Sequence, residues 1–228
     1  MNIYLEKTTS TNDIAKEKAA SLPHGSVIFA EEQTGGRGRF GREFRSPPGT
    51  GIYFSVILHE VPNTSLVTPA AAVAVCRAVA ALTGKSPKIK WVNDILLDGQ
   101  AGDAVGKICG ILSETAGSAI VVGIGINFTT DFSAFPELNA ASVFGKDETP
   151  TCTREELSAR VIEELLELQR VDFIDEYRGL SCLIGKRISY IYNNEKCFGT
   201  VHGIDDDGRL LVDDVVLCAG EVNTVRTE

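Results

Sequence analysis

A glycine- and arginine-rich loop, Gln33-Thr34-Gly35-Gly36-Arg37-Gly38-Arg39-Phe40-Gly41-Arg42, follows an apolar run at 26–30. Its G-x-G-x-x-G spacing matches the dinucleotide-binding fingerprint, but that fingerprint requires a helix immediately afterwards. Here the chain continues as Glu43-Phe44-Arg45-Ser46-Pro47-Pro48-Gly49, and the two prolines and the glycine do not open a helix. The sequence therefore excludes a Rossmann fold.

The loop is a local basic segment in an acidic protein. Four arginines (Arg37, Arg39, Arg42 and Arg45) lie within nine residues, whereas the chain has 22 Lys+Arg against 31 Asp+Glu and a net charge of −9. Guanidinium groups bind phosphate oxygens in pairs, and glycines let backbone N–H groups approach an anion. The loop is a candidate polyphosphate-binding site. The alternative interpretation is that it is an ordinary charged loop exposed to solvent. The acidic balance argues against general binding to a nucleic-acid backbone.

The segments on both sides of the loop predict an α+β fold, a mixed β-sheet with flanking helices. Strands are expected from apolar runs, and helices from amphipathic or alanine-rich periods. The Thr153-Arg154-Glu155-Glu156 segment forms a capping box that opens one of these helices. The strands are expected at 26–30, 52–58, 88–97, 106–114 and 118–127, and the helices at 12–20, 67–82 and from 154 onward.

From residue 181 the pattern changes to short β-rich runs at 187–192, 196–204, 210–212 and 215–217. Turn-forming residues separate them, a pattern typical of a small antiparallel barrel. We therefore predict two domains, residues 1–180 and residues 181–228.

The cysteines and the N-terminus predict a cytoplasmic protein. Six cysteines are scattered without a C-x-x-C pair, which favours buried thiols in a reducing compartment over disulfides or a zinc site. The first residues show no signal peptide. The longest apolar stretches, 69–76 and 119–126, are shorter than the roughly 18 residues of a membrane span. We expect no membrane association.

Three further segments contain residues that are costly to bury or that leave room for a ligand. Lys90 and Asp94 stand at the end of an apolar pattern, and Lys107 opens the next. Charges in such runs need a partner or a ligand, although each lysine taken alone is explained by snorkelling to the surface. Gly123 and Gly125 remove side chains from a strand, which indicates close approach of a ligand or a packing constraint.

Together these segments resemble the biotin protein ligases, also called biotin–[acetyl-CoA-carboxylase] ligases. The arginine–glycine loop and the K-W-x-N-D block are the most specific parts of the resemblance. It departs from the family at Val92, where the family has proline, and at 98–105, which is longer than usual. The segments occur in the family's order: Ser10-Thr11-Asn12, the Gln33–Arg42 loop, Lys90-Trp91-Val92-Asn93-Asp94, Gly106-Lys107-Ile108-Cys109-Gly110-Ile111-Leu112 and Gly123-Ile124-Gly125-Ile126-Asn127.

The resemblance implies a ligase domain followed by a small SH3-like barrel, and a reaction in two steps. Biotin reacts with ATP to give biotinyl-5′-AMP, and a lysine of a biotin carboxyl carrier protein then takes the biotin. The implied biotin-binding residues are Ser10, Thr11, Asn12, Gln33, Gly36, Arg37, Gly110, Leu112, Gly123 and Gly125. The implied nucleotide-binding residues are Arg37, Gly38, Arg39, Arg42, Lys90, Asn93 and Asn127. The implied catalytic residues are Lys107, Arg37, Arg39 and Lys90, with Asp94 as the ligand of Mg²⁺.

Two other features follow from the comparison with the family. Some members carry an N-terminal helix-turn-helix and repress transcription, but the chain begins about one strand before Ser10. We therefore expect a monofunctional ligase that does not bind DNA. Homodimerisation is common in the family, and no apolar stripe in the sequence indicates it here. The alternatives are a lipoate-type protein ligase and a non-catalytic binding module.

Overall fold

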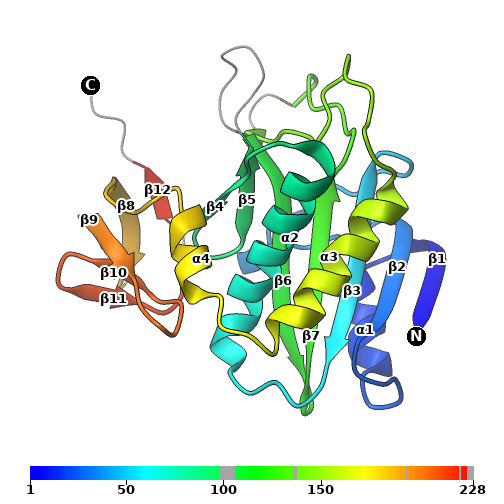
Figure 1. Ribbon diagram of the computed structural model, residues 1–228, viewed down its shortest axis with the longest axis horizontal. Coiled ribbons are helices and arrows are strands. Elements are labelled where there is room, and N and C mark those ends of the chain that lie inside the picture. The colour runs from blue at the N-terminus through cyan, green and yellow to red at the C-terminus, as the bar shows by residue number, and fades with distance from the viewer. Residues whose placement is uncertain (98–105, 136–137, 194, 221, 225–228) are drawn as a thin grey trace.

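The computed structural model describes residues 1–97, 106–135, 138–193, 195–220 and 222–224 (Figure 1). The stretch at 98–105, predicted to be longer than in relatives, lies outside the described residues. A seven-stranded sheet in the order β1-β2-β3-β7-β6-β5-β4 dominates the first part of the chain. Only β1 and β2 of its described strands run parallel. The strands are β1 (Asn2–Thr8), β2 (Ser26–Gln33), β3 (Gly51–Leu58), β4 (Lys88–Lys90), β5 (Asp94–Leu97), β6 (Gly106–Ala116) and β7 (Ala119–Asn127).

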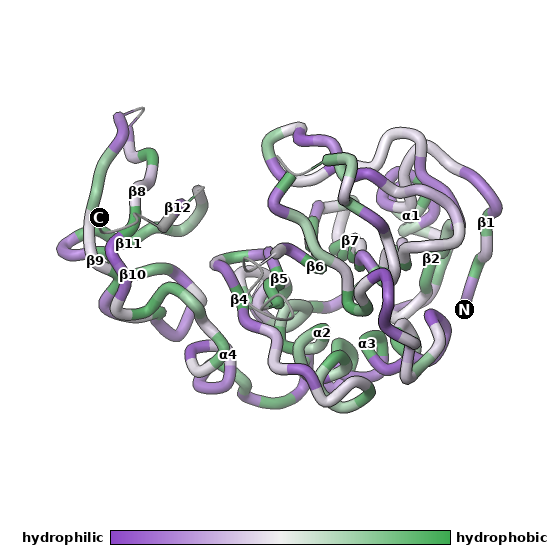
Figure 2. Tube along the Cα trace, turned by 90° about the horizontal axis from the view of Figure 1, so that it is seen from above, coloured by the Kyte–Doolittle hydropathy of each residue, from purple (hydrophilic) through white to green (hydrophobic). Residues whose placement is uncertain are grey.

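Both faces of this sheet are covered by helices. α2 (Val67–Thr83) and α3 (Arg154–Leu168) pack on one face, and α1 (Thr11–Lys18) lies on the other (Figures 1 and 2). Successive strand residues point to opposite faces, so Val56 packs in the cluster with α2 and α3, whereas Ile57 packs in the cluster with α1. Burial on both sides explains why β3 and β7 read as nearly continuous apolar runs.

Among the described residues, one helical stretch, Thr64–Thr83, is long and apolar enough to cross a membrane, with a mean hydropathy of 1.8. It comprises the short 3₁₀ helix η2 (Thr64–Leu66) and α2. Most of α2 is buried against the sheet and α3. A helix that is apolar all round is also what the core of a folded domain requires. In this fold the stretch is a core helix.

The ends of the helices can be compared with the capping residues expected from the sequence. Thr153 and Glu156 exchange both bonds of the predicted capping box at α3, and Gly84 ends α2 in the left-handed conformation at φ +69°. α1 begins at Thr11 and ends at Lys18, one to two residues earlier than predicted. Ser10 is its N-cap residue, but its side chain makes no capping hydrogen bond.

The single strand predicted at 88–97 is wrong. The segment is a tight hairpin, in which β4 and β5 pair antiparallel with Lys90 opposite Asp94. The chain turns at 91–93, and the Trp91–Val92 peptide bond is cis. Trp91 is buried, and its Nε1 donates to Gly208 O at 2.9 Å. The turn thus places the indole between the two parts of the protein instead of extending the strand.

A second sheet of five antiparallel strands follows α4 (Ile174–Leu180), a short helix that the sequence pattern did not predict. Its order is β11-β10-β9-β8-β12, and β12 was also not predicted. The pairings of the described strands do not close a ring, so the SH3-like barrel remains a prediction. Figure 2 shows this sheet beside the first part, beyond α4. The strands are β8 (Arg187–Tyr192), β9 (Glu195–Ile204), β10 (Leu210–Val212), β11 (Val215–Leu217) and β12 (Val222–Thr224).

All six cysteines are free thiols, as predicted, but Cys182 and Cys197 are only half-buried and Cys218 is exposed, against the expectation of buried thiols. Cys76, Cys109 and Cys152 are buried, and burial raises the pKa of the Cys76 thiol to about 12. A thiol held protonated in this way is a small apolar core group and not a nucleophile.

Candidate active site

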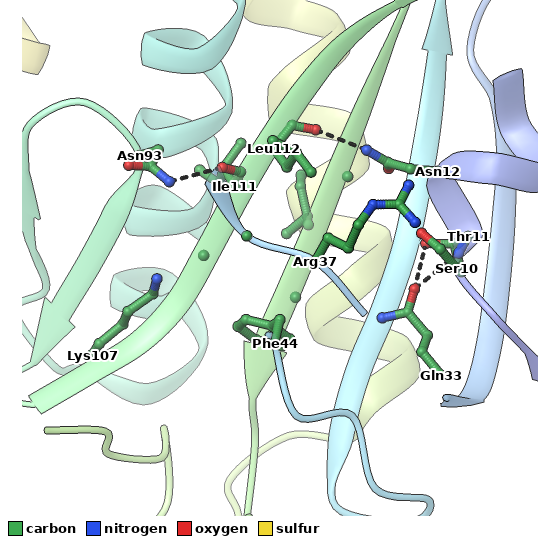
Figure 3. A pocket seen from close by; sticks show the side chains of 15 residues that line it. Ser10, Thr11, Asn12, Gln33, Arg37, Phe44, Asn93, Lys107, Ile111 and Leu112 are labelled. Atoms are coloured by element: carbon green, nitrogen blue, oxygen red, sulfur yellow. Dashed lines mark hydrogen bonds between the residues drawn. The ribbon is translucent and has the colours of Figure 1, made fainter. Parts of the chain in front are cut away.

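A narrow pocket lies between the start of α1, the end of β2, the arginine loop and the middle of β6 and β7 (Figure 3). Its free volume is about 40 Å³. One end is polar and the other is formed by strand backbone and apolar side chains. Its lining residues are Ser10, Thr11, Asn12, Gln33, Arg37, Gly38, Phe44, Asn93, Lys107, Gly110, Ile111, Leu112, Gly123, Ile124 and Gly125.

The polar end is formed by the start of α1 and the last residue of β2. Gln33 Oε1 accepts from Thr11 N at 2.9 Å and from Thr11 Oγ1 at 3.2 Å (Figure 3). Gln33 Nε2 donates to Ser46 Oγ at 2.9 Å. Ser10 and Thr11 are buried. This end therefore presents preoriented donors and acceptors in a mostly dry site, which suits a neutral polar ring.

Two polar residues that sequence reasoning missed hold this end in place. Ser55 on β3 is fully buried, and its hydroxyl lies 2.8 Å from Thr11 Oγ1 and 2.6 Å from Asn12 Oδ1. Glu114 Oε2 accepts from Asn12 Nδ2 at 2.8 Å, while the same nitrogen donates to Leu112 O at 3.1 Å. Both ends of the Asn12 amide are therefore occupied by the protein. Its role here is to fix the start of α1 against β3 and β6.

The glycines of the pocket have different reasons for lacking a side chain. Gly110 and Gly125 stand opposite each other on β6 and β7, and a Cβ at Gly125 would lie 2.5 Å from Phe44 Cε1. A Cβ at Gly123 would lie 2.2 Å from Asn12 Oδ1, so this glycine makes room for the Asn12 amide. Gly36 does not line the pocket; its Cβ position is filled by Phe44 O, at 2.4 Å.

An ion-pair network links Arg37, which lines the pocket, to α1. Arg37 Nη1 donates to Asp13 Oδ2 at 2.8 Å, and its second terminal nitrogen contacts the other carboxylate oxygen. This pairing lowers the pKa of the Asp13 carboxyl below its ordinary value of 3.8. Lys16 bridges Asp13 and Glu114 at 3.3 and 2.7 Å. The loop is thereby attached to α1.

A second, larger cavity of about 1260 Å³ adjoins the first. It is a groove between the arginine loop, the β4–β5 hairpin and the second sheet, and it contains most of the predicted nucleotide-binding residues. Both cavities share Gly38, Phe44, Asn93 and Lys107. The predicted site residues that line only the groove are Arg39, Arg42, Lys90, Asp94 and Asn127.

Lys107 stands where the pocket meets the groove. Its Nζ lies 2.6 Å from Asp94 Oδ1, and its Nζ and Cε would be 3.0 and 3.1 Å from a Cβ at Gly110. Arg39 reaches the same junction, donating to Asn93 Oδ1 at 3.2 Å and to Gly220 O at 2.9 Å. Two cations from distant segments thus converge on the opening, which suits an anion held there.

Two predicted residues lie farther from this junction. Lys90 Nζ is on the exposed side of the groove, 3.5 Å from Asn223 Oδ1. Asn127 is buried, and its Nδ2 donates to the backbone carbonyls of Lys107 and Ala141, each at 3.1 Å. Its amide donors therefore support β6. In the part of the chain that the structure describes, no three His, Cys, Asp or Glu residues form a metal-binding group.

Comparison with known proteins identifies the family. The family model described as the biotin/lipoate A/B protein ligase family matches residues 4–131, and that of the biotin protein ligase C-terminal domain matches residues 183–215. The biotin–[acetyl-CoA-carboxylase] ligase of Mycobacterium tuberculosis is 33% identical, over 96% of this chain and 87% of that protein. The bifunctional ligase/repressor BirA of Bacillus spizizenii is 31% identical, over 92% of this chain and 69% of that protein.

The fold comparison agrees with this result. The biotin protein ligase from Aquifex aeolicus, solved in complex with biotin and ATP, has a TM-score of 0.81 at 24% identity, with 99% of each chain covered. This chain belongs to the biotin/lipoate A/B protein ligase family.

Proposed function

We propose that the protein is a biotin protein ligase, which activates biotin with ATP to biotinyl-5′-AMP and transfers the biotin to a lysine of a biotin carboxyl carrier protein. The observation that supports this most strongly is the junction at Lys107, where a narrow slot with a polar end opens into a basic groove. Such a shape suits a ligand with a polar ring, an apolar chain and a carboxylate that must meet a polyphosphate.

In this proposal the ureido ring of biotin binds at the polar end, near Ser10, Thr11 and Gln33, and the valeryl chain extends along Gly110 and Gly125. The carboxylate then points to Lys107 at the opening of the slot. A site that hydrogen-bonds the ureido group discriminates against lipoate, whose dithiolane ring offers no matching donors and acceptors to this polar end.

The chemistry requires two anions to meet. A carboxylate oxygen attacks the α-phosphorus of ATP, the bond to the β-phosphate oxygen breaks, and pyrophosphate leaves. Lys107, Arg37 and Arg39 supply the positive charge that reduces the repulsion and stabilises the charge growing on the phosphate oxygens. In the second step the carrier's lysine amine attacks the acyl carbon, AMP leaves and the amine loses a proton.

Mg²⁺ fits this groove as a companion of ATP and not as a resident metal centre. Asp94, its predicted ligand, already has Lys107 at one carboxylate oxygen, at 2.6 Å. Mg²⁺ is often held by one or two carboxylates together with substrate phosphates. We propose that Asp94 offers its second oxygen, and the ion would offset phosphate charge when bound.

The proposal includes the domain organisation, the compartment and the partners of the protein. We propose a ligase domain up to about residue 180 and a separate small domain from 181, working in the cytoplasm without membrane or DNA partners. The net charge of −9 disfavours DNA, because non-specific affinity depends on released counterions at many basic contacts. We propose that the protein can form a homodimer, as is common in the family, and a measurement of mass in solution tests this.

Mass spectrometry after incubation with ATP, biotin and a biotin carrier domain tests the proposal. The carrier should gain one biotin on one lysine, and none when that lysine is replaced by arginine. Competition between biotin and lipoate in a pyrophosphate-release assay separates the lipoate-type alternative, which would prefer lipoate. A binding module without activity would give no heat with biotin in calorimetry and no modified carrier.

A further inference from the structure

We propose that Phe44 is a built-in occupant of the acyl slot, so that biotin binds only after the Phe44 ring leaves it. The inference rests on the proposed function, which places the valeryl chain along Gly110 and Gly125. It makes Phe44 a specificity-determining residue: an acyl chain is admitted only when it binds the vacated slot better than the ring does.

The Phe44 ring fills the space that two paired glycines leave free. A Cβ at Gly125 would lie 2.5 Å from Phe44 Cε1 and 2.7 Å from its Cζ, and a Cβ at Gly110 would lie 3.3 Å from Cε2. Gly110 and Gly125 are opposite each other in the sheet. The ring therefore lies against Gly125, where an added side chain would collide with it, and close to Gly110, where an added side chain would be tightly packed against the ring and Lys107.

The space that remains is too small for biotin. A free volume of about 40 Å³ holds only a few water molecules. An acyl chain and an aromatic ring cannot share this slot, because neighbouring heavy atoms need about 3.5–4 Å between them. Binding along these glycines consequently requires a displacement of the ring.

Hydrogen bonds hold the backbone of Phe44, and its ring packs against Tyr53 while it stays half-buried. Phe44 N donates to Gly36 O at 2.9 Å, and Ser46 Oγ donates to Phe44 O at 3.1 Å. The ring meets Tyr53 edge-on, with centroids 6.4 Å apart. Phe44 is only half-buried, so part of its apolar surface is already in water and less burial is lost when it moves.

Phe44→Ala should therefore bind biotin faster. If the open state is populated at about a tenth to a third, removing the competing ring raises the association rate constant roughly 3- to 10-fold. Phe198→Ala is the matched control, because Phe198 is half exposed on the second sheet, away from the slot. Rapid filtration with tritiated biotin measures both variants. An unchanged association rate with faster release would overturn the proposal, since Phe44 would then be a wall of the slot.

A second measurement follows the ring itself. With 4-fluorophenylalanine incorporated, the ¹⁹F resonance missing from Phe44→Leu belongs to residue 44. Saturating biotin should move this resonance towards that of solvent-exposed fluorophenylalanine, whereas a resonance that stays in place overturns the proposal. If biotin binds without moving the ring, this inference is wrong but the proposed function is unaffected. If wild-type protein neither binds biotin in calorimetry nor modifies the carrier, the proposed function fails as well.

Discussion

Lys107 Nζ lies 2.6 Å from Asp94 Oδ1, across a point where β5 and β6 change register between Ile95 and Leu96. The irregularity pairs Asp94 with Gly110 and Leu96 with Lys107. The carboxylate of Asp94 thus holds the Lys107 ammonium over Gly110, at the opening between slot and groove. Both side chains remain about a quarter to a third exposed, so the ammonium is positioned without being sealed away from a ligand.

Replacement of Lys107 by alanine should abolish most adenylate formation while biotin binding survives. An interaction made mainly in the transition state lowers kcat without weakening ground-state binding equally, and loss of one such group typically costs about 100- to 1000-fold. Pyrophosphate exchange measures the first step, and calorimetry measures biotin affinity. Lys146→Ala, at a surface position that is 77% exposed, is the control. If pyrophosphate exchange in Lys107→Ala stays near normal, Lys107 does not stabilise the transition state, and Lys90 becomes the candidate for this role.

Replacement of Asp94 by asparagine should raise the Mg²⁺ concentration needed for half-maximal adenylate formation. The asparagine amide keeps the shape of the side chain but lacks the negative charge with which, we propose, Asp94 binds Mg²⁺. The loss of this charge also weakens the ion pair that holds Lys107. A Mg²⁺ titration at saturating ATP and biotin gives both the maximal rate of adenylate formation and the Mg²⁺ concentration at half of that rate. If the maximal rate falls while the Mg²⁺ midpoint stays the same, Asp94 only positions Lys107 and is not a metal ligand.

Replacement of Asp13 by asparagine should destabilise the protein in a pH-dependent manner. Arg37 lowers the pKa of Asp13 in the folded state, so the stability that this group contributes is complete above pH about 5 and lost as pH falls below about 4. Because the pair is about one third exposed, we expect about 1 kcal/mol or less.

Urea unfolding of wild type and Asp13→Asn between pH 3 and 7 checks this expectation. The difference in free energy of unfolding should shrink towards the acid end of the series. Asp214→Asn, at an exposed position in the second sheet region, is the control and should show no such trend. A difference that grows on acidification would contradict the ion pair as the cause.

The sequence predicted the core strands and the long helices because each contains a complete local signal. The apolar run of β3 and the capping box at Thr153 need no information from distant residues. The segment at 88–97 lacked such a signal, since its apolar pattern continues through a turn that depends on Trp91 packing near Gly208, 117 residues away. The short helix α4 has too few residues for a helical period to stand out.

The site was predictable where a family motif covers it and not elsewhere. The resemblance led to the polar residues around Gln33 and to the cations at the junction, and the pocket brings most of them together. It did not lead to Ser55 or Phe44. A serine within an apolar strand has no sequence signature, and its partners Thr11 and Asn12 lie more than 40 residues away. Gly36 and Gly123 lack side chains where Phe44 O and the Asn12 amide lie, and their contacts with biotin stay predictions.

Replacement of Ser55 by alanine should weaken biotin binding and leave ATP binding unchanged. The Ser55 hydroxyl is fully buried between Thr11 Oγ1 and Asn12 Oδ1. Its removal takes away the donor that lies 2.6 Å from Asn12 Oδ1 and loosens the polar end of the slot. An unpaired buried polar group costs about 1–3 kcal/mol, or roughly 5- to 150-fold in affinity if the whole cost is felt in binding.

Calorimetry with biotin, and separately with a non-hydrolysable ATP analogue, gives the two affinities. Ser26→Ala is the matched control: Ser26 is also fully buried in the same sheet, and its hydroxyl has no hydrogen-bond partner within the described residues. Equal weakening of both ligands by Ser55→Ala would indicate general destabilisation of the sheet. Biotin weakened alone, with Ser26→Ala unaffected, would establish Ser55 as a positioning residue for the polar end of the slot, because other residues line the groove that we propose for the nucleotide.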